Sequence, residues 1–277
     1  MFATRLQSVL SKTAPAVGAT ILGGSIAFVG RDKPAEASDE SIVHPAHYHW
    51  DHAGLLDTFD HKAIRRGYQV YKEVCATCHS VEQIAFRNFV GVTHSTKEMK
   101  ELTAEIDVED GPNDEGEMFD RPGKLADKLP SPYANEEAGR AANGGAYPPD
   151  LSLMIKARHS GPDYVFSLLA GYTEAPEGKD ILPGLYYNPY FDGGLIAMPP
   201  PLDDGQLDYE DGTPATVSQM AKDVVIFLNW CAEPEHDERK KEGFKAVLCL
   251  AAALVFTGFY KRFRWSIYKT RKLSYVN

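Results

Sequence analysis

The clearest chemistry in this sequence is carried by one short run of residues, Cys75-Ala76-Thr77-Cys78-His79. Two thiols at C-x-x-C spacing can add to the two vinyl groups of one haem, and the histidine that follows can ligate the iron. The alternatives are a thioredoxin-like dithiol or half of a zinc site, and a zinc site needs a second Cys or His pair. Cys231 stands alone and Cys249 lies in an apolar run. The motif therefore predicts one covalently bound haem c.

A haem iron held by His79 has a second axial position, for which Met198 is the strongest candidate. A thioether is a soft ligand that favours Fe(II) and raises the reduction potential. Glycines 193 and 194 allow close approach of the backbone, and prolines 199–201 stiffen the loop after the methionine. Met198 could instead be a core residue. The ligand would then be a second histidine, for which His159 is a candidate, or one of the other mid-chain methionines: Met99, Met118, Met154 and Met220.

Two amphipathic segments predict the helices that must position this site. Residues spaced by three and four precede the motif and predict a helix leading into it: Ile64, Gly67, Tyr68, Tyr71 and Val74. A second helix is expected over residues 217–231, with Met220, Val224, Phe227 and Leu228 on one face. The spacing of Gly67, Tyr71 and Cys75 resembles the first helix of class I cytochromes c. In that class the glycine lets the last helix of the domain cross closely.

The charge of the chain is unevenly distributed along its 277 residues. The net charge is −10, but residues 1–37 carry +2 and residues 261–277 carry +6, which leaves −18 on residues 38–260. This acidity argues against a nucleic-acid partner, which requires a basic surface. The first 30 residues contain no acid and combine a basic start with an apolar run. We interpret residues 1–37 as a targeting presequence, with a weak membrane span as the alternative.

A second apolar run lies near the C-terminus. Residues 246–260 carry no charge and are flanked by Lys245 and Lys261, whose side chains can snorkel to a membrane interface. We expect a transmembrane helix over residues 241–262, followed by a basic tail over 263–277; the alternative is a buried core helix. The positive-inside rule places that tail in the matrix or cytoplasm. The haem domain, residues 38–240, then lies on the other side of the membrane.

Acidic residues gather in two places within the haem domain. Residues 101–117 contain eight acids and no Lys or Arg, and residues 203–211 contain five acids. They form either a solvated insertion or a docking surface for a basic soluble partner. Four histidines also lie close together, and the residues between them favour packing over a metal site: His44, His47, His49 and His52.

Taken together, the sequence resembles the cytochrome c1 family, the haem subunits of cytochrome bc1 complexes, from about residue 42 to residue 275. The resemblance rests on many matching segments in order, besides the C-x-x-C-H motif itself. They are residues 50–55, 64–72, 110–113, 121–125, 140–143, 149–152, 157–159, 163–169, 184–191, 211–216 and 232–237.

The resemblance implies a fold and a set of site residues. The fold would be mostly α, a class I cytochrome c fold with long loop insertions plus one C-terminal transmembrane helix. Cys75 and Cys78 would hold the haem by thioether bonds, and His79 and Met198 would ligate its iron. The residues at positions that contact haem propionates are Arg158, Tyr164 and Asn143. A buried propionate requires a charge-assisted donor such as a guanidinium.

The resemblance also implies a function. The chain would be the electron-transfer subunit of ubiquinol–cytochrome c reductase, a quinol-oxidising translocase, with no substrate chemistry of its own. It would pass single electrons from the [2Fe–2S] cluster of the Rieske iron-sulfur protein to soluble cytochrome c. Cytochrome b and a small acidic accessory subunit would be further partners in an obligate, dimeric multi-subunit complex. The complex would lie in the mitochondrial inner membrane, with the haem domain in the intermembrane space and the C-terminus in the matrix.

Three other functions remain open on the residues alone. One is a stand-alone, membrane-anchored electron shuttle, which would not co-purify with a b-type cytochrome. Another is a haem enzyme or gas sensor with an open iron site, which would bind carbon monoxide readily. The third is a structural subunit whose haem does not exchange electrons with cytochrome c.

Overall fold

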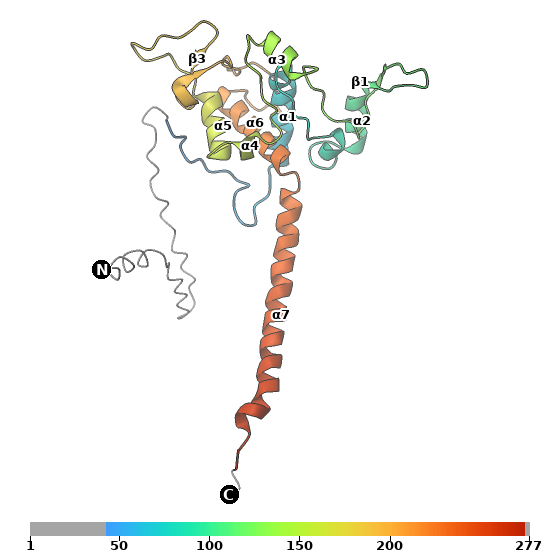
Figure 1. Ribbon diagram of the computed structural model, residues 1–277, viewed down its shortest axis with the longest axis vertical. Coiled ribbons are helices and arrows are strands. Elements are labelled where there is room, and N and C mark those ends of the chain that lie inside the picture. Colours follow the sequence, from blue (N-terminus) through green and yellow to red (C-terminus); the bar gives the residue numbers. More distant parts are fainter. Residues whose placement is uncertain (1–42, 275–277) are drawn as a thin grey trace, which may run out of the picture. The chain divides into compact units, whose positions relative to one another are not determined.

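The computed structural model describes residues 43–274, so the expected presequence lies outside the described residues (Figure 1). The chain is mostly helical, as predicted. In order, the helices are α1 (His61–Glu73), α2 (Thr96–Ala104), α3 (Glu136–Ala142), α4 (Met154–Ala157), α5 (Gly161–Ala170), α6 (Val217–Ala232) and α7 (His236–Thr270). Short 3₁₀ turns occupy Cys75–Thr77, Phe86–Phe89 and Asp192–Gly194.

Two small antiparallel hairpins interrupt the helices. The strands β1 (Asp107–Asp110) and β2 (Phe119–Pro122) pair so that Val108 lies opposite Arg121. The strands β3 (Tyr186–Tyr187) and β4 (Leu195–Ile196) form the second hairpin. The β1–β2 hairpin lies within the long insertion between His79 and Met198, and its sequence is too acidic to contribute to an apolar core.

The core of the domain is built on the crossing of α1 and α6, with α4 and α5 packed beside α6 (Figure 1). Gly67 lies at this crossing. A Cβ atom at that position would be 2.1 Å from the backbone oxygen of Asp223 and 2.7 Å from Cβ of Phe227. Only glycine therefore permits this distance between the two helices. The expected helix pair and its glycine contact are confirmed.

Buried aromatic rings fill the space around this crossing. The Phe227 ring on α6 is fully buried and lies 5.8 Å from Tyr68 and 5.6 Å from Tyr71 on α1, measured between ring centroids. Phe89 and Trp230 complete the cluster. Each such pair contributes about 0.5–1.5 kcal/mol beyond its burial. The hydroxyl of Tyr71 also donates to the backbone oxygen of His79 at 3.1 Å, which connects this core to the haem motif.

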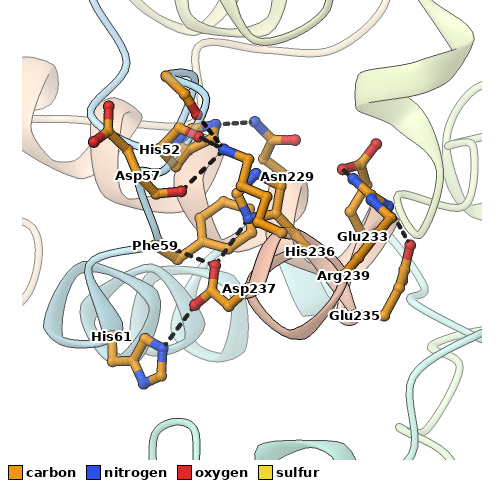
Figure 2. Close-up of polar contacts among 12 residues, drawn as sticks. His52, Asp57, Phe59, His61, Asn229, Glu233, Glu235, His236, Asp237 and Arg239 are labelled. Atoms are coloured by element: carbon orange, nitrogen blue, oxygen red, sulfur yellow. Dashed lines mark hydrogen bonds and ion pairs between the residues drawn. The ribbon is translucent and has the colours of Figure 1, made fainter. Parts of the chain in front are cut away.

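The segment before α1 is fastened to the first turns of α7 (Figure 2). The Lys240 ammonium donates to three backbone oxygens of that segment, those of His52 (2.7 Å), Asp57 (2.9 Å) and Gly54. Asn229 on α6 donates to Nε2 of His52. Burial, together with the nearby His236 and Lys240, lowers the pKa of His52 to about 4. This histidine is therefore neutral and forms part of the packing.

Beyond this junction, α7 continues as one uninterrupted helix of 35 residues. At 1.5 Å per residue it is about 50 Å long. It is long and apolar enough to cross a membrane, and its apolar stretch is not buried against the rest of the described chain. It therefore presents apolar side chains on every side, unlike the amphipathic α1, which buries one face. The alternative of a buried core helix does not apply to this segment.

Candidate haem site

The two motif cysteines lie on a tight turn directly after α1. The helix ends at Glu73, and the 3₁₀ turn Cys75–Thr77 follows. Backbone bonds from Cys78 (3.1 Å) and His79 (2.8 Å) both reach the oxygen of Cys75, so the motif closes on itself. Both thiols are free. Burial, with Cys78 nearby, raises the pKa of Cys75 to about 12 and keeps this thiol protonated.

The imidazole of His79 is oriented by a backbone carbonyl. Its Nδ1 donates to the oxygen of Pro149 at 2.8 Å, which fixes the tautomer and leaves the lone pair of Nε2 free. Burial lowers the pKa of His79 more than this hydrogen bond raises it, so the ring is neutral at pH 7. A neutral imidazole whose second nitrogen is hydrogen-bonded is the usual arrangement of a metal-ligating histidine.

The segment that supplies this carbonyl is itself tightly held. The Asp150 carboxylate accepts hydrogen bonds from Ser80 Oγ (2.9 Å) and from the backbone N–H of Glu82 (2.8 Å). The N–H of Leu151 donates to the oxygen of Ser80 at 2.9 Å. Residues 149–152 therefore clamp the chain that follows the haem motif. Residues 149–152 are among the segments that carry the family resemblance. That the backbone oxygen of Pro149 orients His79 could not be predicted from the types of the side chains.

Met198 lies in the loop directly after β4 and is half-buried. Its backbone oxygen accepts a hydrogen bond of 3.0 Å from the hydroxyl of Tyr172. Burial raises the pKa of Tyr172, with a smaller contribution from Tyr164, so the hydroxyl stays protonated and can donate. Nothing in the local sequence around Tyr172 indicates its contact to a loop 26 residues away.

The alternative iron ligands are placed as follows. Met99 on α2 and Met220 on α6 are completely buried in the apolar core, and Met118 is exposed beside β2. Met154 is the first residue of α4 and packs against the core, and His159 is exposed beside Ser160. Of these residues, the core methionines have their thioethers surrounded by apolar side chains. Met198 is the loop-borne thioether that is half-buried, whereas Met118 lies in an exposed loop.

Arg158 and Tyr164 lie close together. Arg158 follows α4, and Tyr164 lies in the first half of α5. Burial raises the pKa of Tyr164, and the neighbouring Arg158 guanidinium opposes this rise. The Arg158 side chain forms no ion pair within residues 43–274, and its hydrogen bond to the oxygen of Ala157 is long, at 3.4 Å. The guanidinium is therefore available for an anion.

Asn143 lies at the C-terminal end of α3. Its amide donates to the hydroxyl of Tyr133 at 2.9 Å and to the oxygen of Gly139 at 2.8 Å. Both N–H donors of this side chain are thus used, one to cap α3 and the other to contact Tyr133. In the described part of the chain it has no hydrogen bond to any of the other expected site residues.

The four clustered histidines have separate surroundings. Nδ1 of His47 is bonded to Asp163 at 2.9 Å, in a group that also includes the indole N–H of Trp50. His52 is buried at the junction with α7, and His49 is exposed. Between residues 43 and 274, no three His, Cys, Asp or Glu side chains lie together as a metal site would require.

These residues fit a covalently bound haem. Two reduced thiols lie on one turn, and the adjacent imidazole has Nε2 free. A guanidinium that has no carboxylate partner among residues 43–274 lies near a half-buried tyrosine. Residues 50–268 match the model described as the Cytochrome C1 family. The chain belongs to the cytochrome c1 family. This finding confirms the resemblance noted in the sequence.

Relatives from plants and fungi share most of the chain. "Cytochrome c1 2, heme protein, mitochondrial" of Arabidopsis thaliana is 60% identical over 86% of this chain and 78% of its own length. "Cytochrome c1-2, heme protein, mitochondrial" of Solanum tuberosum is 57% identical, over 86% of this chain and 92% of its own length. The "Cytochrome b-c1 complex catalytic subunit, mitochondrial" of Candida albicans is 53% identical over 99% and 96% of the two chains.

Proposed function

We propose that this chain is the haem subunit of a mitochondrial cytochrome bc1 complex and carries single electrons through one covalently bound haem c. The observation that carries this proposal is the His79 imidazole, held with Nε2 free directly beside two reduced thiols in a chain of this family. Haem c supplies a reversible one-electron couple of its iron. The surrounding residues bind it, orient it and set its potential.

The site residues have distinct roles in this proposal. Cys75 and Cys78 bind the haem by thioether bonds, and His79 and Met198 are the axial ligands of the iron. Arg158 and Tyr164 bind a propionate in this proposal, which is supported by the guanidinium lying beside the tyrosine and forming no ion pair within residues 43–274. Asn143 is the third proposed propionate contact, and its amide would donate to the carboxylate in place of its present bond to Tyr133 or to Gly139.

The chain needs no acid–base chemistry of its own to take part in quinol oxidation. Electrons enter from the Rieske iron-sulfur protein and leave to soluble cytochrome c, and cytochrome b is the membrane partner within a dimeric complex. The name of the Candida albicans relative, a catalytic subunit of the cytochrome b-c1 complex, supports this place in a multi-subunit enzyme.

The β1–β2 hairpin supports a docking role for the acidic surface. Several of its carboxylates are exposed and form no ion pair within the described residues: Asp107, Glu109, Asp114, Glu115 and Glu117. In the second cluster, by contrast, Glu210 pairs with Arg65 and Asp211 with Arg66, both at 3.0 Å. The hairpin therefore produces a stronger negative electrostatic field than the second cluster, and this field would steer a basic partner such as soluble cytochrome c. A small acidic accessory subunit is a further neighbour of this region.

The C-terminal helix anchors the domain in the inner membrane. The expected span over residues 241–262 lies within α7, and the basic residues that follow are exposed. By the positive-inside rule, the tail over 263–277 lies in the matrix and the haem domain over 38–240 in the intermembrane space. Residues 1–37 act as the presequence that directs the chain there.

The decisive experiment compares wild type with Met198→Leu in redox-difference spectra. Wild type should keep its haem through acid–acetone extraction and show the weak ferric absorption at about 695 nm that reports methionine ligation. Met198→Leu should keep the haem, lose this absorption and bind carbon monoxide. Extraction of the pigment, or identical spectra for the two proteins, would contradict the proposal. Co-purification with a b-type cytochrome separates the complex subunit from a free shuttle.

A further inference from the structure

The end of α5 makes two separate contacts with the loop that carries Met198. Tyr172 follows the helix by two residues, and its hydroxyl donates to the backbone oxygen of Met198 at 3.0 Å. Tyr172 is half-buried, so this hydroxyl is partly shielded from competing water. The hydrogen bond restrains the peptide group of the methionine itself, which directly limits where its side chain can reach.

Asn188 makes the second contact, and it is completely buried. Its side-chain amide donates to the oxygen of Leu168 in the last turn of α5 at 2.7 Å. Its backbone N–H donates to the oxygen of Gly194 at 3.0 Å, and its side-chain oxygen accepts from the N–H of Tyr190 at 3.1 Å. One buried side chain therefore ties the start of the methionine loop to the helix end.

The other side-chain hydrogen bond to this loop, from the Lys179 ammonium to the oxygen of Gly193 at 2.9 Å, is exposed to solvent. Gly193 and Gly194 both have a φ of 73°, in the left-handed region that glycine adopts at little cost. The only ladder in this part of the described chain is the pairing of the two-residue strands β3 and β4. A Cβ at Gly171 would lie 2.5 Å from the ring of Tyr190, so that glycine lets the loop lie directly against the end of α5.

We propose that Tyr172 and Asn188 are positioning residues that hold the Met198 thioether in place for the iron. This inference rests on the proposed function, in which Met198 is an axial ligand. A neutral hydrogen bond changes an equilibrium by about fivefold, so each contact shifts the balance between the attached and the detached methionine by about that factor.

The test uses Tyr172→Phe in the full-length, haem-loaded protein. Imidazole is the probe, because it competes with the methionine for the ferric iron. We expect imidazole to bind about fivefold more tightly to this variant than to wild type, since the loop detaches more easily. The absorption at about 695 nm should also be lost at lower imidazole concentration. The matched control is Tyr186→Phe on β3, whose side chain is 40% exposed and which should bind imidazole as wild type does.

A double-mutant cycle shows whether Tyr172 acts through the methionine. In a Met198→Leu background, Tyr172→Phe should leave the affinity for imidazole unchanged. An equal effect in both backgrounds would overturn the inference, because the hydroxyl would then act on the whole pocket. Wild-type affinity in Tyr172→Phe would also overturn it while leaving the proposed function intact. If wild type lacks the absorption at about 695 nm, the proposed ligation itself is wrong.

Discussion

At the scale of single residues, backbone oxygens orient both expected iron ligands. The ring of His79 donates to the oxygen of Pro149, and the oxygen of Met198 accepts from Tyr172. A main-chain oxygen that is fixed by neighbouring hydrogen bonds cannot rotate away as a side chain can. Residues 149–152 and the end of α5 are therefore rigid supports for these two residues, which would suit the proposed electron transfer because it requires little rearrangement.

The charge of Arg158 should raise the reduction potential of the bound haem. A cation near the iron disfavours the more positive ferric state, so Arg158→Gln should lower the midpoint potential. A tenfold change in the redox equilibrium corresponds to about 60 mV, and we expect a decrease of that order. Potentiometric titration of the reduced haem band measures the shift. Arg140→Gln is the control, because that guanidinium is already paired with Glu136 at 2.6 Å. Equal potentials for the two variants would contradict the role of Arg158.

At the scale of elements, the crossing of α1 and α6 tolerates no side chain at Gly67. Gly67→Ala would place a methyl group 2.1 Å from a backbone oxygen, which no rotamer change can relieve. We expect a loss of about 3 kcal/mol of unfolding free energy, because the helices must separate. Chemical denaturation followed by circular dichroism measures it. Gly243→Ala on α7 is the control, since its Cβ would meet nothing within 4 Å. Similar stability of the two variants would show that the crossing is not tightly packed.

The helices that could be predicted from the sequence are those whose signal is local. Apolar residues spaced by three and four positions predict α1 between Ile64 and Tyr71, and they predict α6 between Met220 and Leu228. The helix ended at Glu73, slightly before the expected end, because the cysteine motif turns tightly on its own backbone. The supports of the haem site were missed for another reason. The hydrogen bond from Tyr172 to the backbone oxygen of Met198 joins segments that are distant in the sequence. The spacing of apolar residues along the chain does not predict such a contact.

The junction between the segment before α1 and helix α7 should weaken in acid. His52 is 6% exposed, and its pKa falls to about 4 through burial and through His236 and Lys240, against the opposing Asp51 and Asp237. In the unfolded chain the ordinary pKa is about 6.5. Between pH ~6.5 and ~4 the unfolded state therefore binds more protons, and stability falls as the pH falls, by at most about 3 kcal/mol.

Urea unfolding of the full chain in detergent at pH 7 and pH 4.5 measures this loss. His52→Gln removes the titrating group and keeps an acceptor for Asn229, so its stability should depend less on pH than that of wild type. The control is His49→Gln, because the side chain of His49 is exposed. A pH dependence in His52→Gln as steep as in wild type would assign the acid sensitivity to other groups.

At the scale of the whole molecule, the charges are separated along the chain. Residues 38–260 carry a net charge of −18, and the six basic residues of the segment 261–277 lie after the uncharged stretch 246–260 of α7. Within the domain, many carboxylates are neutralised by a neighbouring cation, such as Glu210 by Arg65. Within the described chain most hairpin carboxylates are not, the exception being Asp110, which pairs with Arg121. The net charge of −10 therefore understates how strongly the hairpin attracts a basic protein.

Neutralising the hairpin should slow association with soluble cytochrome c. The triple variant Glu109→Gln, Glu115→Gln, Glu117→Gln should reduce the association rate constant about tenfold at low salt and flatten its dependence on ionic strength. Stopped-flow reduction of cytochrome c measures both.

The control removes the same number of charges from carboxylates that already have arginine partners: Glu136, Glu210 and Glu235. It should change the rate much less, because these carboxylates lie outside the hairpin, although both variants change the net charge by the same amount. Equal decreases in the two variants would mean that the partner responds to net charge and does not recognise the hairpin.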